Sequence, residues 1–88
     1  MSSINVILLD DQKFTFSASS IDPPKSIKGG FQIILKQPVK INNKPLPSEG
    51  RILYGAGTVC QMADGQTLVG RMELTITKEK VTLNIYTA

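Results

Sequence analysis

The stretch from residue 71 to residue 86 alternates apolar and polar residues in two successive runs, and this alternation restricts the fold more than any other feature of the chain. The apolar positions are Met72, Leu74, Ile76, Val81, Leu83 and Ile85. Alternation with a period of two is typical of strands with one buried face, so both runs are predicted to be strands. A hairpin in which Ile76 lies opposite Val81 places all six apolar side chains on one face.

The same pattern specifies the register of this hairpin. Leu74 pairs with Leu83, Met72 pairs with Ile85, and residues 77–80 form the loop. A slip of one residue would turn every apolar side chain toward water, so the register is well determined. A two-stranded hairpin alone is only marginally stable in water, and its apolar face must therefore pack against the rest of the chain.

Length, charge and cysteine content limit the class of protein. The chain has 88 residues, which predicts one β domain over residues 1–88 that buries roughly 60% of its unfolded surface. The net charge of +3 is mild. The single cysteine, Cys60, excludes an internal disulfide and favours a reducing compartment. No segment has the pattern of a signal peptide or the length of a membrane span, so we expect a cytoplasmic or virion-associated protein outside the membrane.

The first thirty residues predict an N-terminal hairpin and then an irregular segment. Residues 4–9 are apolar on both faces, as in a central strand, and Asp10-Asp11-Gln12 supplies a turn. A half-buried second strand is indicated by the alternating residues Phe14, Phe16 and Ala18. The pattern breaks over residues 19–30, where Pro23-Pro24 fixes two φ angles. One helical turn over residues 24–28 is compatible with this segment.

Three short strands are predicted in the middle of the chain. Residues 31–35 form the first, and Pro38 either ends it or marks a sheet edge. Residues 39–41 form the second strand, followed by an irregular loop. Residues 52–54 form the third, which is predicted to stop at Gly55-Ala56-Gly57.

Asp64-Gly65 is the clearest short-range turn signal, because this pair suits a two-residue type I′ turn. Such a turn pairs Met62 with Thr67 and Cys60 with Val69, and it places Gln61 opposite Leu68. Val69 then faces the core together with Cys60. Met72 is also predicted to face the core, yet residues three apart in a straight strand point to opposite faces.

One residue must therefore be absorbed between Val69 and Met72, and Gly70 is predicted to absorb it as a bulge or corner. Sheets that bend through a glycine can curl on themselves. The predicted fold is all-β, a small antiparallel barrel or a compact sandwich of about seven or eight short strands arranged largely as a meander.

The composition argues against catalysis. The chain has no histidine, which removes the commonest general base and metal ligand. Cys60 therefore has no imidazole partner and is expected to be a core residue. Most carboxylates fall in predicted turns, and Gly55-Ala56-Gly57 precedes a strand, not the helix that a phosphate-binding loop requires. We expect no catalytic residues, no cofactor and no bound metal.

The middle of the chain is basic, and this asymmetry gives an alternative function. Small β domains bind single-stranded nucleic acid through a basic groove and aromatic stacking. The candidate contacts for this alternative are Lys25, Lys28, Lys36, Lys40, Lys44, Arg51 and Tyr54. Lysines also solubilise loops and protect edge strands from pairing, which explains them without a ligand.

The favoured function is protein–protein interaction or assembly. Leu53, Leu68 and Tyr86 are predicted on the outer face of the sheet, and residues 4–9 are apolar on both faces. A small domain with surplus apolar surface needs a partner to cover it. The expected partner is a protein, most simply a second copy in a homo-oligomer. By analogy of size and class, such a module could be a structural subunit of a viral or phage particle, or a small inhibitor or adaptor.

Overall fold

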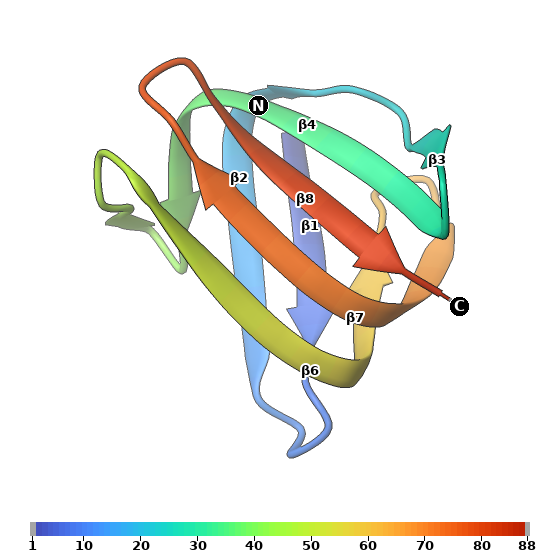
Figure 1. The fold of residues 1–88 in the computed structure, drawn as a ribbon. Helices are drawn as coiled ribbons and strands as arrows, with labels where there is room; N and C mark the ends of the chain where they lie inside the picture. Colours follow the sequence, from blue (N-terminus) through green and yellow to red (C-terminus); the bar gives the residue numbers. More distant parts are fainter. Residues whose placement is uncertain (1, 88) are drawn as a thin grey trace.

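The computed structural model describes residues 2–87, which form eight antiparallel strands and no helix (Figure 1). The strands are β1 (Ser2–Ile7), β2 (Lys13–Ile21), β3 (Lys25–Ile27), β4 (Gly30–Ile41), β5 (Lys44–Pro45), β6 (Gly50–Gln61), β7 (Thr67–Ile76) and β8 (Lys80–Tyr86). This arrangement confirms the predicted all-β class and the predicted number of strands.

Backbone pairing joins six of the strands into a ring. The order is β2-β1-β6-β7-β8-β4, and β4 pairs again with β2. The two short strands β3 and β5 each pair with β4. The shortest link of the ring lies between β1 and β6, where residues 5–7 pair with residues 59–61. The ring encloses one core.

Alternate residues of the ring strands point inward and fill this core. The buried apolar side chains are Ile4, Val6, Phe16, Ala18, Ile33, Leu35, Val39, Cys60, Leu68, Met72, Leu74, Ile76, Val81, Leu83 and Ile85. Burying one aliphatic side chain contributes roughly 1.5–3 kcal/mol. The closed ring is therefore stabilised by residues from all six of its strands.

Both predicted terminal hairpins are present. In the β7–β8 hairpin Ile76 pairs with Val81 and Met72 pairs with Ile85, so the predicted register is confirmed. In the β1–β2 hairpin Ile4 pairs with Phe16, and β1 lies between β2 and β6 as expected of a central strand. β1 ends at Ile7, two residues earlier than predicted.

The predicted register of the β6–β7 hairpin was wrong by one residue. Cys60 pairs with Leu68 and Val59 pairs with Val69, so Leu68 points into the core and Val69 points outward. The connection is a five-residue loop over residues 62–66, closed by a hydrogen bond from the Met62 N–H to the Gln66 carbonyl. The Asp64 carboxylate accepts a hydrogen bond from the Gln66 N–H at 2.9 Å, which stabilises this longer loop.

The bulge or corner predicted near Gly70 is present, but it lies in the strand opposite Gly70 and not in β7, because the corrected register removes the conflict of parity. Leu68, Met72 and Leu74 all face the core along an uninterrupted β7. The irregularity lies across from it in β6, where residues 55–57 separate the two paired segments of the strand. β6 therefore does not stop at residue 54 as predicted but bends and continues to Gln61.

The middle of the chain contains longer strands than predicted. The two short strands on either side of Pro38 are one strand, β4, which pairs with β8 over residues 30–36 and with β2 over residues 35–41. Figure 1 shows β4 curving from one side of the ring to the other. Neither ladder pairs Pro38, so the missing N–H is tolerated where β4 changes partner.

Two further local predictions in this region were wrong. The segment predicted to allow a helical turn contains the extended strand β3. The irregular loop predicted after residue 41 begins instead with a two-residue hairpin turn at Asn42-Asn43. Both φ angles of this turn are positive, at 50° and 67°. Positive φ at both central residues is the requirement of a type I′ turn, and asparagine tolerates it well. This turn places β5 beside the end of β4.

Candidate functional site

An outward-facing row of aliphatic side chains crosses three strands of the ring. Val59 of β6 pairs with Ile7 of β1 on one side and with Val69 of β7 on the other. These side chains point away from the core, because the neighbouring residues Cys60 and Leu68 point into it. Val69 is 50% exposed, and Ile7 and Val59 are half-buried.

Leu9 extends this row beyond the end of β1. Its side chain is 78% exposed and lies against the bend of β6, since a β-carbon on Gly57 would come within 2.8 Å of Leu9 Cδ2. We refer to Ile7, Leu9, Val59 and Val69 together as the apolar surface. Leu53, which is 66% exposed, lines a hollow of about 420 Å³ together with Leu9, Tyr54 and Ala56.

The three predicted interface residues occupy different environments. Leu53 is exposed on the outer face of β6 as predicted. Leu68 is buried in the core and presents no side chain to a partner. Tyr86 is half-buried on the outer face of β8, and the Arg71 guanidinium lies 5.1 Å from its ring centroid. The interface prediction therefore missed the apolar surface, although the apolar character of both faces of residues 4–9 had indicated one part of it.

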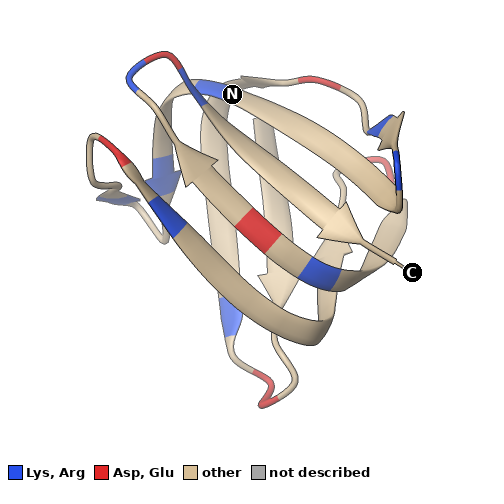
Figure 2. Cartoon of the chain, viewed as in Figure 1, with Lys and Arg blue, Asp and Glu red and all other residues tan. Residues whose placement is uncertain are grey.

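The basic residues of the alternative reading are divided between separate parts of the molecule (Figure 2). Lys36 of β4 lies directly opposite Lys80 of β8. Lys40 and Lys44 belong to the β4–β5 hairpin. Lys25, by contrast, belongs to β3, beside the opposite end of β4. The predicted basic segment is therefore not one continuous surface.

Lys28 lies in the turn between β3 and β4. The other two candidates for nucleic-acid contact, Arg51 and Tyr54, already have partners within the protein. Arg51 forms an ion pair with Glu73, with 3.0 Å between Nη2 and Oε2. The Tyr54 ring lies 6.3 Å from the Phe14 ring, centroid to centroid, and burial raises the pKa of its hydroxyl. A half-buried ring packed in this way offers little surface for stacking with a base.

Cys60 lies in the core, 1% exposed, and burial raises the pKa of its thiol to about 12. The thiol is therefore protonated at neutral pH and unreactive as a nucleophile. Among residues 2–87, no three Cys, Asp or Glu side chains lie together as a metal site would require.

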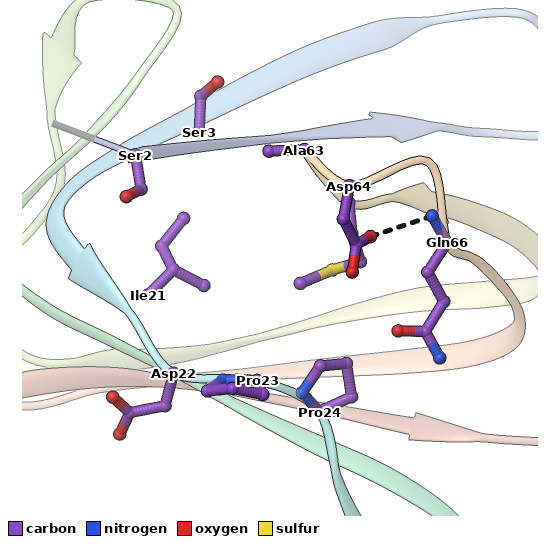
Figure 3. Close-up of a pocket in the computed structure, with 10 residues that line it drawn as sticks. Ser2, Ser3, Ile21, Asp22, Pro23, Pro24, Ala63, Asp64 and Gln66 are labelled. Atoms are coloured by element: carbon purple, nitrogen blue, oxygen red, sulfur yellow. Dashed lines mark hydrogen bonds between the residues drawn. The ribbon is translucent and has the colours of Figure 1, made fainter.

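A second hollow, of about 340 Å³, lies between the beginning of β1, the end of β2 and the loop after β6 (Figure 3). Its lining includes Ile21, Pro23, Pro24 and Met62, and the carboxylate of Asp64. That carboxylate accepts the Gln66 N–H, and the Asp22 carboxylate points away from Asp64 in Figure 3. The lining is thus mainly apolar, and its carboxylates do not converge on one point.

Residues 2–87 contain no helix that could cross a bilayer. A comparison of the chain with protein-family models, with curated proteins and with solved structures finds no match in any of the three. The geometry of the apolar surface is therefore the basis for a functional proposal.

Proposed function

We propose that this protein is a non-enzymatic assembly module that binds another protein through the apolar surface. The observation that supports the proposal is the row formed by Ile7, Val59 and Val69 on three paired strands. An outward aliphatic row loses contact with water when a partner covers it, and each square ångström covered contributes about 25 cal/mol. Contiguous apolar surface of this kind marks interaction sites on small domains.

Polar residues border the row, which is the usual arrangement of a protein interface. Asn5, Gln61 and Thr67 lie side by side on the same three strands, in the next outward-facing row. Protein interfaces have apolar centres and polar rims that remain in contact with water. The paired strands hold both rows in fixed positions, so binding requires little ordering of the backbone.

Two kinds of assembly module would use such a surface. A structural subunit, of the kind found in viral or phage particles, would use it to contact further copies of itself. An inhibitor or adaptor would use it to contact a larger protein. Sedimentation equilibrium at micromolar concentration separates the two kinds, because only the first shows species heavier than 9.6 kDa.

The test of the apolar surface compares Val69→Lys with Thr82→Lys. Both positions lie on the outer face of the ring, and Thr82 lies on β8, two strands from β6. We expect Val69→Lys to weaken association and Thr82→Lys to leave it unchanged. If the wild type is a monomer, the wild type and the same two variants are immobilised as baits, and the proteins that each of them retains are compared. A bait series in which Val69→Lys retains every protein that the wild type retains would contradict the proposal.

A second candidate function, binding of single-stranded nucleic acid, is favoured by the position of Lys36 directly opposite Lys80 on paired strands. Like charges placed directly opposite each other on paired strands are destabilising, and a bound polyanion would relieve this repulsion. Titration of labelled oligonucleotides at low salt tests it. Replacing Lys36 and Lys80 by glutamine should weaken binding and reduce its salt dependence. The matched control replaces Lys25 and Lys28 by glutamine, and equal losses in both pairs would exclude a site at Lys36.

A further inference from the structure

The first half of β6 has a strand neighbour on one side. Residues 50–54 pair with β7, whereas β1 pairs with the opposite side of β6 through residues 59–61. Within the described strands, no Cα atom of β6 lies within 8 Å of a Cα atom of β2 or β5. The backbone N–H and C=O groups on this side of residues 50–54 therefore form an open sheet edge among residues 2–87.

This edge lacks the features that usually protect sheet edges. Such features include very short strands, lysine, proline and a covering segment. β3 has three residues including a lysine, and β5 has only Lys44 and Pro45. Residues 50–54 of β6 contain neither lysine nor proline, and their one charged side chain, Arg51, is paired with Glu73. The β6 edge is thus the longest strand edge in the described chain that is left free to pair.

We propose that this edge pairs antiparallel with the same edge of a second copy of the chain, centred on Ile52. The inference rests on the proposed assembly role and names the partner. Ile52 then lies opposite Ile52 of the partner subunit, and Arg51 lies opposite Leu53 of the partner subunit. Such a contact is symmetric about a twofold axis, so the unpaired N–H and C=O groups of one strand edge bond to those of the same edge in the partner subunit. The sheet then continues from β7 and β6 of one copy into β6 and β7 of the other.

The alternation of β6 selects this register. Ile52 and Tyr54 pack against the core, whereas Arg51 and Leu53 face outward. A register shifted by one residue would place inward residues opposite outward ones. Centring the pair on Arg51 would bring two guanidinium groups together, which is destabilising. Centring it on Leu53 would include Gly55, where β6 begins its bend.

The side chains along the proposed contact are complementary. Within one copy, Leu53 lies opposite Glu73 of β7. In the pair, the other neighbour of Leu53 is Arg51 of the partner subunit. The apolar part of an arginine side chain covers neighbouring apolar surface while its guanidinium remains in water. Each exposed Leu53 is therefore covered, with the negative charge of Glu73 from its own copy on one side and the positive charge of the partner's Arg51 on the other.

Disulfide trapping tests the register directly. Chains carrying Arg51→Cys are mixed with chains carrying Leu53→Cys and oxidised mildly. Directly opposite residues have Cβ atoms about 4.5–5.5 Å apart, close to disulfide geometry, whereas diagonal neighbours are about 7–8 Å apart. We expect the mixture to form a cross-linked dimer and neither variant alone to form one. Cross-linking of Leu53→Cys with itself, or no cross-linking in the mixture, would overturn the proposal.

The variant Leu53→Lys tests the contact without cross-linking. Its new ammonium group lies beside Glu73 within one copy, so folding stability should not fall. In the dimer the same group lies opposite Arg51 of the partner subunit, at two symmetric positions. We expect the dissociation constant of the dimer to rise about tenfold.

Val69→Lys is the comparison, because Val69 lies on the apolar surface and not on the β6 edge. Loss of association in Leu53→Lys supports pairing through the edge, and loss in both variants agrees with contacts through the edge and the apolar surface together. Loss in Val69→Lys alone retains the proposed assembly role and overturns the strand pairing. No self-association in the wild type overturns the strand pairing as well, and the assembly role is then judged on a foreign partner.

Discussion

The main chain of Tyr86 occupies the space that a β-carbon on Gly70 would need. A β-carbon built on Gly70 contacts the Tyr86 carbonyl oxygen and comes within 2.9 Å of the carbonyl carbon. Gly30 stands in a similar relation to the same segment, since its β-carbon would come within 2.8 Å of the carbonyl carbon of Ile85. The end of β8 is therefore held closely between β7 and β4 by two residues without side chains.

Gly70→Ala should destabilise the fold by about 2 kcal/mol or more. The atoms that its methyl group would meet belong to the backbone, so no side-chain rotation relieves the overlap, and overpacking of this kind typically costs about 1–3 kcal/mol. Gly55→Ala is the matched control, because a β-carbon there has no neighbour within 4 Å. The two variants are compared by urea denaturation. Equal, small losses would show that β7 and β8 do not approach each other in this way.

Leu68→Ala and Val69→Ala test the register of the β6–β7 hairpin. Leu68 is 7% exposed and Val69 is 50% exposed. Truncating a buried leucine costs about 2–5 kcal/mol, whereas surface substitutions usually lie within about 0.5 kcal/mol of the wild type. We expect the midpoint of denaturation to fall strongly only for Leu68→Ala. The reverse order would restore a two-residue turn at Asp64-Gly65.

Stability should fall at alkaline pH through Cys60. Burial raises the pKa of its thiol from 9.0 to about 12. Below pH 9 the thiol is protonated in both states; between pH 9 and pH 12 the unfolded chain loses this proton and the folded chain keeps it. The unfolded state then binds fewer protons, so stability decreases as the pH rises, by about 1 kcal/mol at pH 10.

The measurement is denaturation of the wild type and of Cys60→Ala at pH 7.5 and pH 10, with reductant present. Other groups titrate in both proteins, so the difference between their pH dependences isolates the thiol. We expect the wild type to lose more stability than Cys60→Ala over this interval. Identical losses would mean that the thiol reaches water in the folded protein.

The Asn42-Asn43 turn predicts opposite effects at two adjacent positions. The Asn42 side-chain oxygen accepts a hydrogen bond from the Thr15 N–H at 2.9 Å, so Asn42→Gly should cost about 1 kcal/mol. Asn43 also has positive φ, at 67°, and glycine adopts this conformation without steric cost. Asn43→Gly should leave stability unchanged or raise it slightly. Thermal denaturation compares the stabilities of the two variants. The variants would be equally stable if the Asn42 side chain made no hydrogen bond to Thr15 of β2.

The alternation within residues 71–86 was sufficient to predict the β7–β8 hairpin and its register. The three apolar residues of each run are spaced two apart, so pairing Ile76 with Val81 places all six on one face, and the same reasoning identified the β1–β2 hairpin. Leu53 was correctly placed on the outer face of its strand for the same reason. These features depend on residues close together in the chain.

The tertiary structure decided the features in which two local solutions compete. Asp64-Gly65 fits a two-residue turn, yet the five-residue loop allows Leu68, Met72 and Leu74 to enter one core along an unbroken β7. The free energy gained by burying Leu68 in that core outweighs the local preference of Asp64-Gly65 for a two-residue turn. The outward position of Val69, and with it the outward row, follows from that choice. No local pattern could have located the row, because it joins residues from β1, β6 and β7 only after the ring has closed.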